Sequence, residues 1–349
     1  MKKITSLELG VTFAGCFLGA GFISGQEIFQ FFGSFGIGGF WGLLLALFVM
    51  AAFGILLVEL SRLTGIVEMD RIVVGDRWAP MRATVAGVAV FLLAGIHVIM
   101  TAGAASLLHR VFGLPQLLGA AAFCLLVTVV AFAGLQGMVK LFSAAVPALT
   151  VMAILIAAWT MARWGLQGMD LTPKDSGNPL LATWWISGLT FVSYNLFCAL
   201  GAITPAGRLV PDRKTSVRGI TIGCLLMSAI AGSIQISMAI RPEVTVVDLP
   251  MLDLAYMLWP PLGILFAVLL LCGIFGTSLS SVVSVASFLQ AKNPALRDKL
   301  TILALGILAL LGSQVGFAPL ISVVYPLCGY FGLLAMALMF LHYRRVTKK

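Results

Sequence analysis

The chain has 349 residues, of which 60% are hydrophobic and 10% are charged, and its mean hydropathy is +1.08. This composition excludes a soluble globular protein and is typical of a multi-pass membrane protein. Because one span takes about 20 residues, the length holds about ten membrane-spanning helices and leaves no room for a separate soluble domain. The six cysteines stand in apolar segments without CxxC spacing, which argues against disulfides and against a structural metal site.

The first expected span, residues 6–33, contains three glycines in its middle. The stretch 19–30 reads GAGFISGQEIFQ, with glycines at Gly19, Gly21 and Gly25. Each glycine costs a helix about 1 kcal/mol relative to alanine, so an unbroken helix is unfavourable here. Non-helical backbone at membrane depth is tolerated where it lines a cavity or is buried in protein, and an interrupted span indicates a transporter binding site. A packing face of small residues is the alternative, but it does not account for the polar residues beside the break.

Nine further spans and three polar connections follow along the chain. The spans are expected at 37–60, 84–108, 116–134, 139–162, 183–206, 217–240, 258–290, 300–316 and 319–341, and the connections at 62–82, 164–181 and 241–253. Spans one to five occupy about 6–162, and spans six to ten about 183–341. We expect these nearly equal halves to form a single membrane transport domain over 1–349.

An odd number of spans in each half places the two halves in opposite orientations. Aligning their starts carries Gly19 onto Leu196, beside the polar Ser193, Tyr194 and Asn195 of the sixth span. We therefore expect an all-α integral membrane protein of about ten transmembrane helices in a LeuT-like five-plus-five inverted repeat, with helices 1 and 6 broken. This expectation rests on the number of spans and the placement of the breaks, since no sequence identity between the halves is visible.

The basic residues predict the orientation. With both termini in the cytoplasm, 18 of the 22 Lys and Arg fall inside, because only Arg110, Arg163, Lys174 and Arg241 fall outside (22 − 4 = 18). The positive-inside rule favours this orientation. It also accounts for the net charge of +9 without a nucleic-acid partner.

The glycine-containing stretch resembles the signature of a known family. The sequence GFISGQEI at 21–28, followed by Phe31 and Phe32, resembles the GFASGQE-type motif of bacterial YkvI-type membrane proteins. These form an amino-acid permease family within the amino acid–polyamine–organocation superfamily. The resemblance implies a LeuT-type fold, a bacterial cytoplasmic (inner) membrane location and a small amino-acid-like or related organic substrate, without naming that substrate.

Two polar segments are candidates for the substrate site. Unwinding of the first span frees backbone amides and leaves a half-helix N-terminus near Ser24, whose positive dipole end suits a substrate carboxylate. The sixth span offers a hydroxyl, a phenol and an amide for a polar ligand; hydrogen bonds between helices are the alternative role. The expected substrate-binding residues are Gly19, Gly21, Ser24, Gly25, Glu27, His97, Ser193, Tyr194 and Asn195.

Two ionisable residues of this set stand inside spans, where charge is costly and commonly functional. Glu27 follows the break and is interpreted as a protonatable coupling site, a partner for a substrate amine or a gate, with capping of a neighbouring helix as the alternative. His97 lies midway along the third span. It lines the pocket or relays a proton, or it is a buried histidine bonded to a backbone carbonyl.

The eighth span is rich in hydroxyls near Thr277 and Ser278. In sodium-coupled members of the fold that the resemblance implies, hydroxyls at this place join first-helix carbonyls around Na⁺. The resemblance therefore implies a Na⁺ site made by Thr277, Ser278 and the carbonyls of Gly19 and Phe22, while helix packing is the alternative. Na⁺ is favoured over H⁺ as coupling ion by a small margin, and no other cofactor is expected.

Enzymatic functions find no support in the sequence, which lacks an HExxH motif, a Walker-type loop and a carboxylate pair placed for hydrolysis. We predict an ion-coupled secondary active transporter that works by alternating access. Its partners are a small-molecule substrate and the lipid bilayer. A membrane receptor or assembly subunit that binds without transporting, and a passive channel, are the alternatives. The sequence does not fix the oligomeric state.

Overall fold

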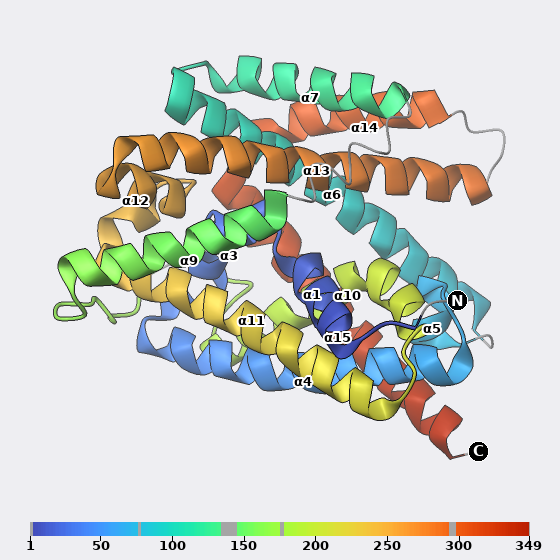
Figure 1. The fold of residues 1–349 in the computed structure, drawn as a ribbon. Coiled ribbons are helices and arrows are strands. Elements are labelled where there is room, and N and C mark those ends of the chain that lie inside the picture. Colours follow the sequence, from blue (N-terminus) through green and yellow to red (C-terminus); the bar gives the residue numbers. More distant parts are fainter. Residues whose placement is uncertain (1–2, 76–77, 134–144, 175–177, 293–297, 349) are drawn as a thin grey trace.

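The computed structural model describes residues 3–75, 78–133, 145–174, 178–292 and 298–348, and these ranges are helical throughout, apart from loops (Figure 1). The long helices are α4 (Ile37–Thr64), α6 (Ala79–Phe112), α9 (Ala145–Trp164), α10 (Trp184–Gly207), α11 (Arg213–Ile240), α13 (Pro260–Lys292) and α15 (Phe317–Thr347). The shorter helices are α1 (Ser6–Phe17), α2 (Ala20–Ile23), α3 (Gln26–Phe31), α5 (Met69–Val74), α7 (Gln116–Phe132), α12 (Pro250–Leu258) and α14 (Asp298–Gly312). The start of the expected fifth span, with Lys140, lies outside the described residues.

Seven helices of the described residues are long and apolar enough to cross a membrane: α4, α6, α9 from Pro147, α10, α11, α13 to Gln290, and α15. The first, fourth and ninth expected spans correspond to shorter apolar helices, at Ser6–Phe17, Gln116–Phe132 and Lys299–Val315. Each of the ten expected spans therefore overlaps an apolar helix of the described residues, although the first helix covers only the beginning of its expected span.

Helices at equivalent places in the two halves pack together. α4 packs on α11, α6 on α13, and α7 on α14, while α1 packs on both α10 and α11. Figure 1 shows α7 and α14 side by side at one edge, with α13 and α6 between them and the rest of the bundle. This arrangement brings the first span and the sixth span, α10, into the centre of the molecule.

Local sequence signals explain where two of these helices begin. Thr5 caps α1, because its hydroxyl accepts a hydrogen bond from the Glu8 amide at 3.2 Å and the Glu8 carboxylate accepts one from the Thr5 amide at 2.8 Å. Asp212 caps α11 by accepting from the Thr215 amide at 2.7 Å. This bond holds the pKa of the Asp212 carboxyl below its usual range.

The predicted interruption of the first span is confirmed. α1 ends at Phe17, the single turn α2 follows, and α3 begins only after Gly25. Gly25 has φ of +89°, in the left-handed region that favours glycine. Its amide donates to the Phe22 carbonyl at 3.1 Å, and the Ser24 hydroxyl donates to the Gly21 carbonyl at 2.9 Å. The chain therefore turns inside the span instead of continuing as one helix.

The predicted break in the sixth span is wrong. α10 runs without interruption from Trp184 to Gly207. The polar side chains form hydrogen bonds with backbone carbonyls of α10 itself. The Ser193 hydroxyl donates to the Thr190 carbonyl and the Asn195 amide to the Phe191 carbonyl, both at 2.9 Å. No glycine or proline falls between residues 189 and 200. Polar side chains alone therefore do not unwind this helix.

Candidate functional site

Glu27 is the centre of the candidate site. It is the second residue of α3, directly behind the break, and it is only 4% exposed. The hydroxyl of Tyr194, midway along α10, donates a hydrogen bond to its carboxyl group, and the Asn195 side chain is a second partner. The structure thus brings the break of the first span against the polar segment of the sixth span.

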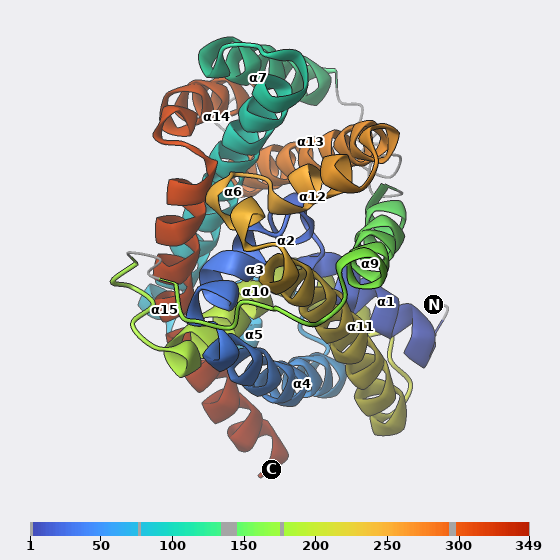
Figure 2. The ribbon, with the colours of Figure 1, turned by 90° about the vertical axis from the view of Figure 1, so that its left-hand side faces the viewer.

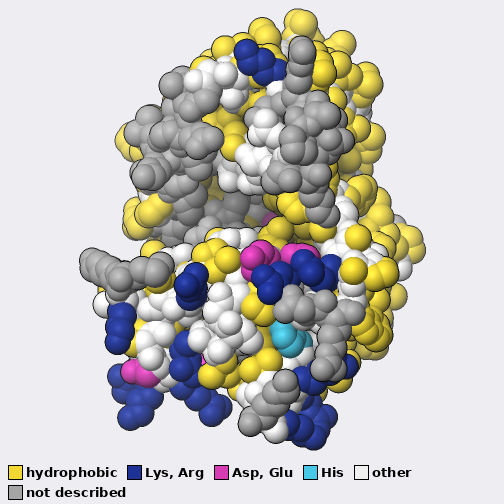
Figure 3. All heavy atoms as spheres, turned by 90° about the vertical axis from the view of Figure 1, so that its right-hand side faces the viewer, with side chains coloured by type: hydrophobic (Ala, Val, Ile, Leu, Met, Phe, Trp, Pro, Cys, Tyr) yellow, Lys and Arg dark blue, Asp and Glu magenta, His cyan; other side chains and the backbone are white. Residues whose placement is uncertain are grey.

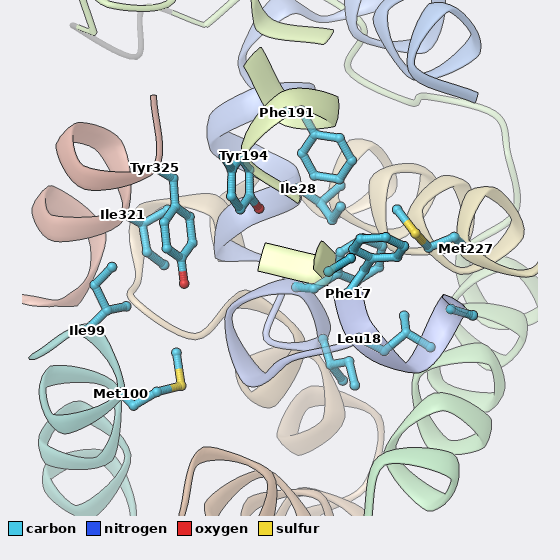
Figure 4. Packing of buried hydrophobic residues seen from close by; sticks show 14 of the residues in the cluster. Phe17, Leu18, Ile28, Ile99, Met100, Phe191, Tyr194, Met227, Ile321 and Tyr325 are labelled. Carbon is cyan, nitrogen blue, oxygen red and sulfur yellow. The ribbon is translucent and has the colours of Figure 1, made fainter. Parts of the chain in front are cut away.

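Two tyrosines form a wall beside this carboxyl group. Tyr194 and Tyr325 of α15 are stacked, with ring centroids 4.7 Å apart and an interplanar angle of 12°. Figure 4 shows the two rings among apolar side chains, with Ile321, Ile99 and Met100 around Tyr325. Tyr325 was not among the residues predicted for the site. Its one sequence signal is a tyrosine next to a proline in an apolar span.

Gly21 supplies the space that the carboxyl group occupies. A Cβ atom at this position would lie 3.2 Å from Glu27 Oε2 and 3.7 Å from the Tyr325 hydroxyl. The first of these separations is closer than ordinary van der Waals contact. The absence of a side chain at Gly21 therefore lets the carboxyl group and the tyrosine approach the backbone of α2.

The partners of Glu27 are all neutral. None of the ion pairs among the described residues includes Glu27. A carboxylate in a membrane interior normally pairs with a cation or lines a water-filled cavity. The charge of this group is therefore not compensated by a basic side chain of the described chain.

The remaining predicted site residues fall into a second group. His97 Nδ1 lies 2.7 Å from the Ser278 hydroxyl, so this pair links α6 to α13, and His97 Nε2 is buried without a partner. The Thr277 hydroxyl donates to the Gly273 carbonyl at 3.0 Å. The carbonyls of the first span are also engaged, since the Gly19 carbonyl accepts from Ile23 and the Phe22 carbonyl from Gly25, each at 3.1 Å.

Two predicted residues bind elsewhere. The Ser193 hydroxyl donates to the Gly329 carbonyl of α15 at 2.6 Å and to the Thr190 carbonyl of its own helix, not to Glu27. The Ser24 carbonyl accepts from the amide of Met251 at 2.9 Å, which joins the break to α12. Figure 2 shows α12 lying over α2 and α3 at this end of the molecule.

A hydrogen bond and an ion pair connect α6 to α12 and to the residues just before it. The Ser106 hydroxyl donates to Asp248 at 2.6 Å, and Arg110 pairs with Asp253 at 2.6 Å. These residues border a cavity of about 350 Å³. The sequence showed a polar connection here but not that it folds back over the first span.

Comparison with known proteins supports this architecture. No protein-family model matches the chain. The uncharacterized membrane protein YkvI of Bacillus subtilis (strain 168) is 23% identical over 336 residues, which cover 95% of this chain and 94% of YkvI.

Three solved structures superpose on almost the whole chain. Mhp1 in an inward-facing conformation has a TM-score of 0.64 and 18% identity, and covers 98% of this chain and 77% of its own. MhsT in complex with L-phenylalanine has a TM-score of 0.63 and 16% identity, with 97% and 89% covered. A Na⁺-coupled sialic acid symporter in a substrate-bound outward-open state has a TM-score of 0.61 and 14% identity, with 97% and 79% covered.

The helix order, the broken first span and these superpositions define a multi-pass membrane protein with the LeuT fold. Within that fold, the chain is similar to the membrane protein YkvI along nearly the full length of both sequences. The resemblance predicted from the stretch 19–30 is therefore confirmed.

Proposed function

We propose that the chain is a secondary active transporter of a small amino-acid-like or related organic solute, which works by alternating access and is driven by an ion gradient. The observation that carries this proposal is the buried carboxyl group of Glu27 behind the break of the first span. Intramembrane carboxyl groups commonly mark substrate or ion pathways, and broken helices of LeuT-fold transporters form their binding sites. Proteins described as symporters share the fold.

Na⁺ is the proposed driving ion, with H⁺ as the alternative. Thr277 and Ser278 stand on α13, which packs against α2, and a protein of this fold is described as Na⁺-coupled. A Na⁺ ion at these hydroxyls and at the carbonyls of Gly19 and Phe22 would take Ser278 from its contact with His97. Ion binding in this proposal therefore loosens the link between α6 and α13.

The proposed location is the bacterial cytoplasmic membrane, with both termini inside. Both termini lie at the same end of the molecule in Figure 1. Figure 3 views the molecule from that end and shows Lys and Arg side chains gathered there. This distribution supports the orientation expected from the positive-inside rule.

Uptake into proteoliposomes tests the proposal. Purified protein is reconstituted, and uptake of a radiolabelled mixture of amino acids is followed with a Na⁺ gradient alone, with a pH gradient alone, and by counterflow. A carrier accumulates solute and exchanges it, a channel only equilibrates it, and a receptor does neither. Loss of Na⁺ dependence in the double variant Thr277→Val, Ser278→Ala is expected, with Ser284→Ala, an exposed hydroxyl of the same helix, as the control. Accumulation that is driven by the pH gradient without Na⁺ would show that H⁺, not Na⁺, is the driving ion.

A further inference from the structure

The protonation state of Glu27 is constrained by its surroundings. The side chain is buried, its hydrogen-bond partners are a phenol and an amide, and no ion pair among the described residues includes it. A carboxylate without a countercharge is costly in such a place, because burial removes water and two neutral hydrogen-bond partners replace only part of its stabilisation of the charge. The group therefore needs either a bound proton or a cation that the described residues do not supply.

The hydrogen bonds around Glu27 fit a protonated carboxyl group. Tyr194 donates to one oxygen of Glu27. The Asn195 amide nitrogen donates one of its two N–H groups to the Phe191 carbonyl at 2.9 Å, so the amide can meet Glu27 either with its oxygen or with its second N–H. A carboxylic acid accepts through one oxygen and donates through the other, so it can accept from Tyr194 and donate to the amide oxygen of Asn195, whereas a carboxylate can only accept, from Tyr194 and from the second N–H of Asn195.

The same place suits an ammonium group once the proton has left. An ammonium has three donors. Around the Glu27 carboxylate stand the hydroxyl oxygens of Tyr194 and Tyr325, and the Tyr325 hydroxyl has no hydrogen-bond partner among the described residues. Gly21 keeps a side chain out of this space. Among the residues that the structure describes, no basic side chain forms an ion pair with the carboxylate.

We propose that Glu27 holds a proton in the empty site and exchanges it for the ammonium group of the transported solute, which is therefore a primary amine. In this step the O–H bond of the carboxylic acid breaks and its proton passes to solvent. The carboxylate pairs with the ammonium group, which enters already protonated, so one positive charge enters and one leaves. The inference rests on the transporter function proposed above, and it names the solute class and the exchanged ion.

The first test detects the proton directly. Infrared difference spectra of substrate-free protein in lipid nanodiscs are compared between the wild type and Glu27→Gln. We expect the variant to lose a carbonyl band of a protonated carboxylic acid. Glu59→Gln is the matched control, since Glu59 is equally buried but paired with Arg62, and it should keep the band. If Glu27→Gln does not fold, Tyr194→Phe serves instead, because loss of the donated hydrogen bond moves the band to higher frequency. An unchanged spectrum in the folded variant overturns the proposal.

The second test detects the exchange. Ethylamine, L-alanine and propanoate, which share a short carbon chain and differ in charged groups, are added to weakly buffered protein, and proton release is followed with a pH-sensitive dye. Release is expected with ethylamine and L-alanine and not with propanoate, and it should vanish in Glu27→Gln. The exchange is overturned if neither amine releases protons, or if proton release persists in Glu27→Gln.

The two proposals fail separately. If amino acids accumulate in proteoliposomes without proton release, the proposal of a transporter stands and the proposed exchange at Glu27 is rejected. Proton release by amines without any counterflow would retain the site and remove the transporter. Thus each result concerns one proposal only.

Discussion

Two buried glutamates of the first half differ in one respect. Glu27 is 4% exposed and Glu59, near the end of α4, is 2% exposed. Glu59 accepts two hydrogen bonds from Arg62, at 3.0 and 2.7 Å, and one from Ser216 at 2.5 Å, whereas the partners of Glu27 among the described residues are neutral. Burial alone therefore does not mark a functional acid. The missing countercharge distinguishes Glu27, and it leaves room for a proton or a solute cation.

The largest effect is expected from filling the space beside Glu27. In Gly21→Leu a bulky side chain would collide with the Glu27 carboxyl group and Tyr325, so we expect uptake and binding to be abolished while membrane insertion is intact. Gly15→Leu is the control, because a Cβ at Gly15 meets no atom within 4 Å. Uptake and insertion are measured in the same cells. Normal uptake by Gly21→Leu would mean that the glycine serves packing only.

Removing the acid should have the next largest effect. Hydrogen bonds to charged groups contribute about 1.5–3 kcal/mol, so Glu27→Gln should weaken amine binding by about 10- to 100-fold. Binding is measured by competition against a radiolabelled amine. Glu59→Gln should lower thermal stability and leave the affinity unchanged. Equal losses of affinity in the two variants would remove the distinction between the two acids.

A smaller effect is expected from the neutral partner. Tyr194→Phe removes the hydroxyl that donates to Glu27 and leaves the aromatic stacking in place. One hydrogen bond contributes about 1 kcal/mol, so the affinity for an amine should fall about fivefold. Tyr330→Phe, which removes the hydroxyl bonded to the Leu180 carbonyl at 2.7 Å, is the control. Titration of both variants with ethylamine checks the difference, and a fivefold loss in the control would contradict it.

The smallest effect on transport is expected at the paired acid. Arg62→Met leaves Glu59 without its countercharge, and because Arg62 is 25% exposed the cost should be about 2–3 kcal/mol, below that of a fully buried pair. Unfolding should therefore occur at a lower temperature, with the KM for uptake unchanged. Thermal unfolding in detergent and uptake kinetics measure the two quantities. An altered KM would place Glu59 in the transport pathway.

The sequence predicted the break of the first span because its signal is local. Three glycines within seven residues disfavour a helix whatever surrounds them, and Gly25 indeed adopts a positive φ. The polar residues of the sixth span carry no such signal. Ser193 and Asn195 donate to carbonyls of their own helix. Polar residues in this span therefore do not indicate that the helix unwinds, and the prediction based on them is wrong.

Other parts of the site depend on tertiary packing and were missed for that reason. Tyr325 comes to Tyr194 from α15, far along the chain, and Met251 of α12 reaches back to Ser24. The link between His97 and Ser278 was also not predicted, although both residues were singled out. Sequence periodicity places such residues in spans but does not say which of them meet.

The most direct measurement of the central claim is the affinity for ethylamine as a function of pH. If a proton and an ammonium group exclude each other at Glu27, the apparent Kd should rise about tenfold for each unit by which the pH falls, over the range in which the empty site holds its proton. The dependence should be absent in Glu27→Gln and present in Glu59→Gln. A Kd that is independent of pH in the wild type, or a dependence that survives in Glu27→Gln, would contradict the account.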